Sequence, residues 1–161
     1  MPTSLVGVNT QVPNRLVFNA IKNNIVEELY GYSDFYREVK TDDHSRIDIL
    51  LTNGDRDKCY VEVKNCTLVE DGMAKFPDAV TKRGLKHLFE LQKLVSEGCR
   101  SVMFFLIQRM DADIFKPADK IDPTYGKELR RAVANGVEIV VYDVYIDLQK
   151  IVLNRKVPFF R

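Results

Sequence analysis

Two apolar, β-branched runs carry charged residues in their interiors, and this pairing restricts the possible fold more than any other feature. The runs are IDILL, at residues 47–51, and CYVEVKN, at residues 59–65, and the segment between them contains Asn53-Gly54. Asn-Gly between two strand-like runs is a strong signal for a β-hairpin. We therefore expect the two runs to pair antiparallel, which brings Asp48 beside Glu62.

The charged residues of this hairpin form a candidate site for phosphodiester hydrolysis. Side chains alternate along a strand, so Glu62 and Lys64 share one face of the sheet. Asp48, Glu62 and the backbone carbonyl of Val63 offer the oxygen ligands that Mg²⁺ prefers, and Mn²⁺ can replace it. Lys64 can orient or deprotonate an attacking water, or stabilise developing negative charge. Glu27 and Glu38 are further acidic candidates for the rim. We expect no small-molecule cofactor.

The Glu62-x-Lys64 motif also has a simpler interpretation, as an exposed ion pair on a strand. Glu and Lys are common at solvent-facing strand positions, where a cross-strand ion pair contributes only ~0.5 kcal/mol. Asp48, however, has an isoleucine on each side. Asp is depleted from strands and costly to bury without a partner. Its presence in the same hairpin as the Glu-x-Lys motif raises the weight of the catalytic interpretation, and both interpretations remain open on the sequence alone.

A basic segment follows the hairpin. Between residues 81 and 93 the only acid is Glu90, whereas the basic residues are five. Arg83 and His87 lie one helical turn apart, from where they could reach a phosphate backbone. The alternative for His87 is a hydrogen-bonded histidine on a solvated helix flank. The candidate nucleic-acid-binding residues are Arg46, Lys82, Arg83, Lys86 and His87.

The order of predicted elements indicates an α/β fold. A three-strand meander is followed by helix, strand, helix and strand, which gives a mixed β-sheet flanked by helices. The 161 residues suggest a single domain. The predicted helices cover residues 13–31, 78–98 and 122–136, and the predicted strands cover residues 34–40, 45–51, 58–65, 101–107 and 137–144, with an edge hairpin over 148–160 and a loop over 69–74.

Composition suggests a cytoplasmic protein. Its three cysteines, Cys59, Cys66 and Cys99, are irregularly spaced, which suggests reduced thiols. The first fourteen residues show no signal peptide, and no apolar run reaches the ~18 residues that would predict a membrane span. No coiled coil or interface patch decides between a monomer and a homodimer.

Several motifs together resemble the sugar fermentation stimulation protein A family. They are SRIDILL, YVEVKNCTL, FPDAVTKRGLKHLFEL and DPTYGKELRRAVANGVEIVVYDV, and the resemblance covers roughly Val8 to Val144. It implies a restriction-endonuclease-like, PD-(D/E)xK fold, with Asp48, Glu62 and Lys64 as the metal-binding and catalytic set. It also implies that the FPDAVTKRGLKH segment faces DNA, and that Glu27 matches an acidic helix position of such nucleases.

The resemblance leaves the activity open. Its fold implies a Mg²⁺-dependent DNA phosphodiesterase, whereas the family is described as a DNA-binding regulator of sugar metabolism genes that need not cleave. A domain with a vestigial site is the third possibility, and the intact triad disfavours it. Family members usually carry an N-terminal OB-like domain, a type of fold that commonly binds oligonucleotides. We expect this chain to lack it and to form one nuclease-like domain over residues 1–161.

Overall fold

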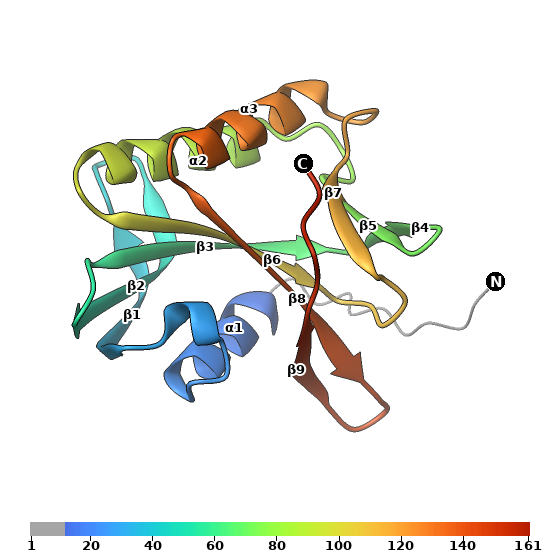
Figure 1. Ribbon diagram of the computed structural model, residues 1–161, viewed down its shortest axis with the longest axis horizontal. Helices are drawn as coiled ribbons and strands as arrows, with labels where there is room; N and C mark the ends of the chain where they lie inside the picture. The colour runs from blue at the N-terminus through green and yellow to red at the C-terminus, as the bar shows by residue number, and fades with distance from the viewer. Residues whose placement is uncertain (1–11) are drawn as a thin grey trace.

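The computed structural model describes residues 12–161. The first residues of the family resemblance and most of the stretch assessed for a signal peptide lie outside these described residues. Within them, the chain forms a large mixed sheet with helices on both faces (Figure 1). The helices are α1 (Val12–Lys22), α2 (Lys82–Ser96) and α3 (Pro123–Ala134), with a short 3₁₀ turn η1 (Glu27–Leu29).

The large sheet has six strands in the order β1-β2-β3-β6-β8-β9. The β1–β2, β2–β3 and β8–β9 pairs are antiparallel, whereas β3–β6 and β6–β8 are parallel. This is the predicted meander followed by two crossovers, and the predicted α/β fold class, a mixed sheet flanked by helices, is confirmed. The strands are β1 (Tyr32–Lys40), β2 (Arg46–Gly54), β3 (Cys59–Cys66), β6 (Arg100–Ile107), β8 (Glu138–Ile146) and β9 (Ile151–Lys156).

Two hydrophobic cores lie on the two faces of this sheet. Helix α1 packs on one face and helices α2 and α3 on the other (Figure 1). Strand β6 separates the cores, because Met103 and Phe105 belong to the α2–α3 core while Val102 and Phe104 belong to the α1 core. All four side chains are fully buried, as predicted from the continuous apolar run in this strand.

Several elements differ from the prediction, among them β2, which continues through Asn53-Gly54 and pairs there with β1. The first helix ends at Lys22, because Asn24 takes a left-handed φ of 56° and turns the chain away. Helix α2 begins four residues later than predicted, because Thr81, not Asp78, caps it by accepting a hydrogen bond from the Gly84 amide. The predicted loop over 69–74 contains two short strands of a second sheet, whose members are β4 (Leu68–Glu70), β5 (Met73–Phe76) and β7 (Ile114–Pro117).

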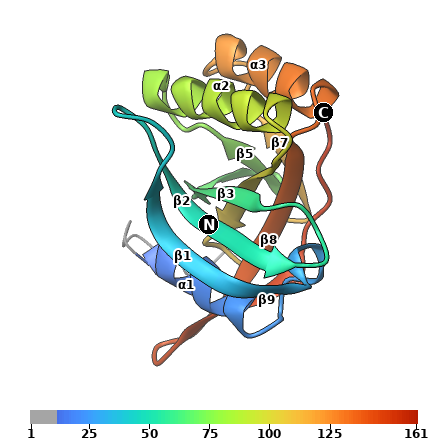
Figure 2. The same cartoon turned by 90° about the vertical axis from the view of Figure 1, so that its left-hand side faces the viewer.

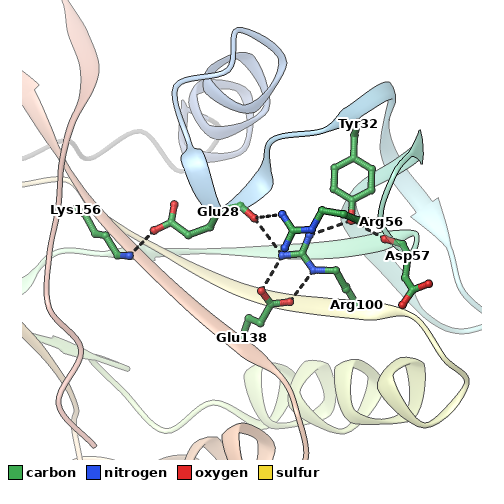
Figure 3. A network of polar contacts seen from close by, with 7 residues as sticks. All are labelled: Glu28, Tyr32, Arg56, Asp57, Arg100, Glu138 and Lys156. Carbon is green, nitrogen blue, oxygen red and sulfur yellow. Dashed lines mark hydrogen bonds and ion pairs between the residues drawn. The ribbon is translucent and has the colours of Figure 1, made fainter.

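A polar network attaches the segment after α1 to the sheet (Figure 3). Arg100, at the start of β6, donates through Nε and Nη2 to the two carboxylate oxygens of Glu138, over 2.9 and 2.7 Å. Its Nη1 donates to the Tyr32 hydroxyl, and its Nη2 also donates to the Glu28 carbonyl. Lys156 lies 2.7 Å from the Glu28 carboxylate. This bidentate pairing fixes geometry as well as contributing energy, so η1 and β1 are held in place against β6, β8 and β9.

Within residues 12–161 no helix is both long and apolar enough to cross a membrane.

Candidate active site

The β2–β3 hairpin forms the centre of the candidate site. Its register pairs Ile49 with Val61 and Leu51 with Cys59. Continuing this register by one residue places Asp48 opposite Glu62, as the sequence predicted. The paired register stops at Ile49, so the two strands separate where these two carboxylates meet.

Asp48 accepts two hydrogen bonds at this separation. Its Oδ2 accepts a 2.8 Å hydrogen bond from the backbone amide of Val63. In a regular sheet, this amide would donate to a backbone carbonyl of the neighbouring strand. Asp48 Oδ1 accepts from the Asn14 side chain of α1, also over 2.8 Å. The strand also twists here, since Ile47 packs in the α2–α3 core and Ile49 in the α1 core, although strict alternation would put them on one face. Asp48 therefore occupies a break in the regular sheet.

Glu62, Lys64 and His87 form a compact cluster on the α2 face. The Lys64 ammonium lies 2.9 Å from Glu62 Oε1, and His87 Nδ1 lies 2.6 Å from the same oxygen. The Lys64 nitrogen and His87 Nδ1 are themselves 2.6 Å apart. All three side chains are largely buried: Lys64 is 13% exposed, Glu62 4% and His87 12%. The other carboxylate oxygen of Glu62, Oε2, is buried and has no hydrogen-bond partner.

The two carboxylates differ in acidity. Burial, and then the negative charge of Glu62, raise the pKa of Asp48 from 3.8 to about 6. Burial alone would raise the pKa of Glu62 as well, but the hydrogen bond from His87 and the charge of Lys64 outweigh it and leave that pKa lowered. Near neutral pH the site therefore holds two ionised carboxylates side by side, and a cation would relieve their repulsion.

Helix α2 is positioned over the cluster by Asp122. This buried carboxylate accepts hydrogen bonds from the backbone amides of Thr81, before α2, and of Tyr125, in α3. Gly84 allows the close approach, since a Cβ there would lie 2.8 Å from the Thr81 methyl group and 3.2 Å from the Tyr125 ring. The first turns of α2 are thereby fixed in front of β2 and β3, with Arg83 and His87 directed to the site.

Two cavities open at this place. The smaller, about 140 Å³, contains both carboxylates, and its lining residues are Glu38, Arg46, Ile47, Asp48, Glu62, Arg83 and His87. The larger, about 400 Å³, lies beside it and shares Arg46, Arg83 and His87; its remaining lining residues are Lys40, Asp42, Asp43, His44, Ser45 and Lys86.

Most of the predicted site residues are brought together, with two exceptions. Asp48, Glu62, Lys64, Glu38, Arg46, Arg83 and His87 gather at the smaller cavity or its wall, and Lys86 lines the larger one. Glu27 is not brought there, because it lies in η1 and lines neither cavity. Lys82 is exposed on α2 and lines neither cavity.

Two contacts could not be read from the sequence. Asn14 reaches Asp48 from a helix that is distant in sequence, and a single Asn on an amphipathic helix gives no signal of this. His87 was expected to face DNA, but its Nδ1 contacts Lys64 and Glu62 inside the cluster. The other possibility considered from the sequence, a hydrogen-bonded histidine, is closer to the structure.

The donor set suits a hard cation held by few protein ligands. Across residues 12–161 there is no group of three or more His, Cys, Asp or Glu side chains arranged to hold a metal ion. Asp48 and Glu62 thus form a two-carboxylate set, which is the number that Mg²⁺ commonly takes from a protein. The unpartnered Oε2 of Glu62 and the remaining lone pairs of Asp48 are available to such an ion.

A mixed sheet with an Asp and a Glu-x-Lys motif on adjacent strands, at the point where the strands separate, defines a nuclease-like α/β domain. Residues 11–150 match the sequence family described as "Sugar fermentation stimulation protein RE domain". The chain therefore belongs to the sugar fermentation stimulation protein (SfsA) family, as the sequence motifs suggested.

Curated relatives and a solved structure agree with this membership. The chain is 52% identical over 153 residues to a sugar fermentation stimulation protein homolog of Geotalea daltonii, covering 95% of this chain and 66% of the relative. It is 54% identical over 141 residues to the homolog of Geotalea uraniireducens, covering 88% of this chain and 61% of the relative. The structure of Pyrococcus furiosus SfsA in complex with Ca²⁺ superposes with a TM-score of 0.91 at 27% identity, covering 99% of this chain and 69% of that one.

The raised pKa of Asp48 predicts a pH-dependent stability effect. A carboxyl group whose folded pKa is raised stabilises the fold fully only below its unfolded value of 3.8, and this contribution is lost as the pH rises through about 6. Asp48→Asn removes that loss. We expect the metal-free variant to match the wild type near pH 4 and to exceed it by about 2 kcal/mol at pH 7.5, in urea unfolding with chelator present.

The exposed Asp55→Asn is the matched control and should change stability little at either pH. A variant at position 48 that is less stable than wild type at pH 7.5 would identify the Asp48 carboxylate as a structural partner rather than a strained site carboxylate.

Proposed function

We propose that this chain is a divalent-cation-dependent DNA phosphodiesterase. One observation carries the proposal: Asp48 and Glu62 are held side by side where β2 and β3 separate, with a buried Glu62 oxygen left unpartnered and Lys64 bound to the other. Burying two like charges side by side is costly even with one ammonium beside them, so their presence beside a solvent-open cavity is better explained by ligand binding than by stability.

The ligands of the cation would be Asp48, Glu62 and the carbonyl of Val63. The Val63 amide points to Asp48, and the N–H and C=O of one strand residue point to the same neighbouring strand. The Val63 carbonyl is therefore directed to the side of Asp48 as well. The relative solved with Ca²⁺ supports a divalent ion at a site of this kind, and Mg²⁺, or Mn²⁺ in its place, suits the same oxygen donors.

When bound, such a cation neutralises phosphate charge and makes a water more nucleophilic. The protein contributes the positioning. Asn14 and the Val63 amide fix the Asp48 carboxylate through its two oxygens, while Lys64 and His87 fix Glu62 through Oε1 and leave Oε2 free. Neither carboxylate can turn away from the cavity without losing these hydrogen bonds.

Lys64 is the group placed to act on the reacting atoms. Its ammonium carries three donors, and the contact to Glu62 leaves others available. From this position it can orient the water that attacks phosphorus, or offset the negative charge that develops on the phosphate as the bond to the leaving oxygen breaks.

The surroundings favour a phosphate backbone as substrate. Arg46 and Arg83 line the smaller cavity from β2 and α2, and Lys86 continues the positive charge into the larger one. Cationic side chains of this kind attract nucleic acid and set its register without reading its sequence. We therefore propose DNA as the partner, while a homodimer remains an untested prediction.

The direct test is cleavage of labelled single-stranded and double-stranded DNA with Mg²⁺ or Mn²⁺, and with chelator. We expect metal-dependent cleavage by the wild type and by Lys127→Ala, an exposed α3 lysine, and its loss in Lys64→Ala with an unchanged unfolding curve. DNA binding without cleavage under every metal condition would refute the phosphodiesterase and indicate a regulatory, DNA-binding role instead.

His87 offers a second test, because its contacts predict a role in positioning Lys64 rather than in gripping DNA. We expect His87→Ala to lower kcat about 100-fold, the scale of a misplaced catalytic group, while DNA affinity changes less than about twofold. His87→Asn, whose side-chain amide can replace the Nδ1 contact, should recover part of the loss. A fall in DNA affinity with kcat retained would show instead that His87 binds the phosphate backbone.

A further inference from the structure

The larger cavity, here called the Lys86 pocket, lies beside the carboxylates and is not required for the chemistry proposed above. It is enclosed by the β1–β2 turn, residues 41–45, and by the first two turns of α2, and Figure 2 shows this turn rising beside α2. Its charged lining residues are four permanent cations, Lys40, Arg46, Arg83 and Lys86, and two acids, Asp42 and Asp43. The pocket is therefore net positive, which favours an anion.

The turn that forms one wall is held in a defined conformation. Thr41 and Ser45 close it through a 3.0 Å backbone hydrogen bond, and the His44 amide donates to Asp42 Oδ1 over 2.7 Å. Lys86 donates to the His44 carbonyl over 3.0 Å and so connects α2 to the turn. The Asp42 carboxylate thus serves the backbone of the turn. Lys86 has three donors, and this contact leaves two for a ligand.

The size of the pocket limits what it can take. Its volume of about 400 Å³ lies near the lower end of the range for small-ligand sites, which suits one nucleotide. It shares Arg46, Arg83 and His87 with the carboxylate cavity, so a nucleotide bound there would be a close neighbour of the group being hydrolysed.

We propose that the Lys86 pocket binds the phosphate of the nucleotide next to the scissile phosphodiester. Lys40 and Lys86 are its distinguishing contacts, since they line this pocket and not the carboxylate cavity. The role of this pocket in catalysis rests on the proposed function, whereas phosphate binding by the pocket does not depend on it. The phosphate recognised is either an internal diester or the monoester at a strand end, and a monoester, with charge ≈ −1.5 to −2, would bind more strongly.

The test separates binding from cleavage. Metal-free protein in chelator and low salt is titrated with inorganic phosphate by NMR or calorimetry, using wild type, Lys86→Met, Lys40→Met and the control Lys82→Met. Lys82 lies on the same helix, is equally exposed and lines neither cavity. We expect affinity to fall about tenfold in Lys86→Met and in Lys40→Met, as for loss of a charged hydrogen bond, and to stay within about twofold in Lys82→Met. Lys86 also donates to the turn, whereas Lys40 lies in β1 before it. The Lys40 variant therefore distinguishes loss of a ligand contact from a change in the wall.

Oligonucleotides that differ only in a 5′-phosphate, a 3′-phosphate or hydroxyl ends identify the source of the phosphate. If the protein prefers one phosphorylated end and Lys86→Met loses this preference, the pocket binds the phosphate at a strand end. If all three oligonucleotides bind equally and Lys86→Met weakens each of them, the pocket binds an internal phosphate. The proposed phosphate site would be refuted if wild type, Lys86→Met and Lys40→Met bound phosphate with equal affinity. It would also be refuted if Lys82→Met lost as much phosphate affinity as these two variants. Phosphate binding that depends on Lys86 and Lys40 in a protein that never cleaves DNA would refute the phosphodiesterase alone.

Discussion

The hydrogen bond from the Val63 amide to the Asp48 carboxylate is the interaction on which the site depends. It takes the place of a strand-to-strand bond where the β2–β3 pairing ends, at Ile49 and Val61. The separation directs two carboxylates into one cavity while β3 continues its parallel pairing with β6 beyond Glu62. A carboxylate thus acts both as a structural acceptor and as a candidate ligand, and its raised pKa reflects first its burial and then the nearby charge of Glu62.

The rest of the fold supplies rigidity on either side of this break. The α1 core and Asn14 support Asp48 from one face of the sheet. On the other, Asp122 fixes the start of α2, which carries His87 to Lys64 and Glu62. The Arg100 network fixes the segment between α1 and β1 (Figure 3). Catalytic groups need this kind of support, because small displacements of a positioned group reduce rates strongly.

The sequence predicted the features that depend on local pattern. Alternation and the Asn53-Gly54 signal predicted the hairpin and placed Asp48 opposite Glu62, although Asn53 and Gly54 themselves lie in β2 and the turn follows them. The apolar run of β6 predicted a strand buried on both faces. Features that depend on tertiary contact were missed or misplaced. Glu27 was expected at the site because the first helix was extended through it, whereas Asn24 ends that helix earlier. The contact of His87 with Lys64 and the approach of Asn14 to Asp48 join segments 23 and 34 residues apart, which no periodicity reveals.

Calorimetric titration with Mg²⁺ and Ca²⁺ measures whether the separated strands bind a cation at all. We expect one divalent ion per chain for the wild type and loss of that binding in Glu62→Gln, which keeps the shape of the side chain and removes its charge. The folded state of the variant is checked by its unfolding curve. Equal binding by both proteins, or none by the wild type, would contradict the assignment of Asp48 and Glu62 as a metal-binding pair.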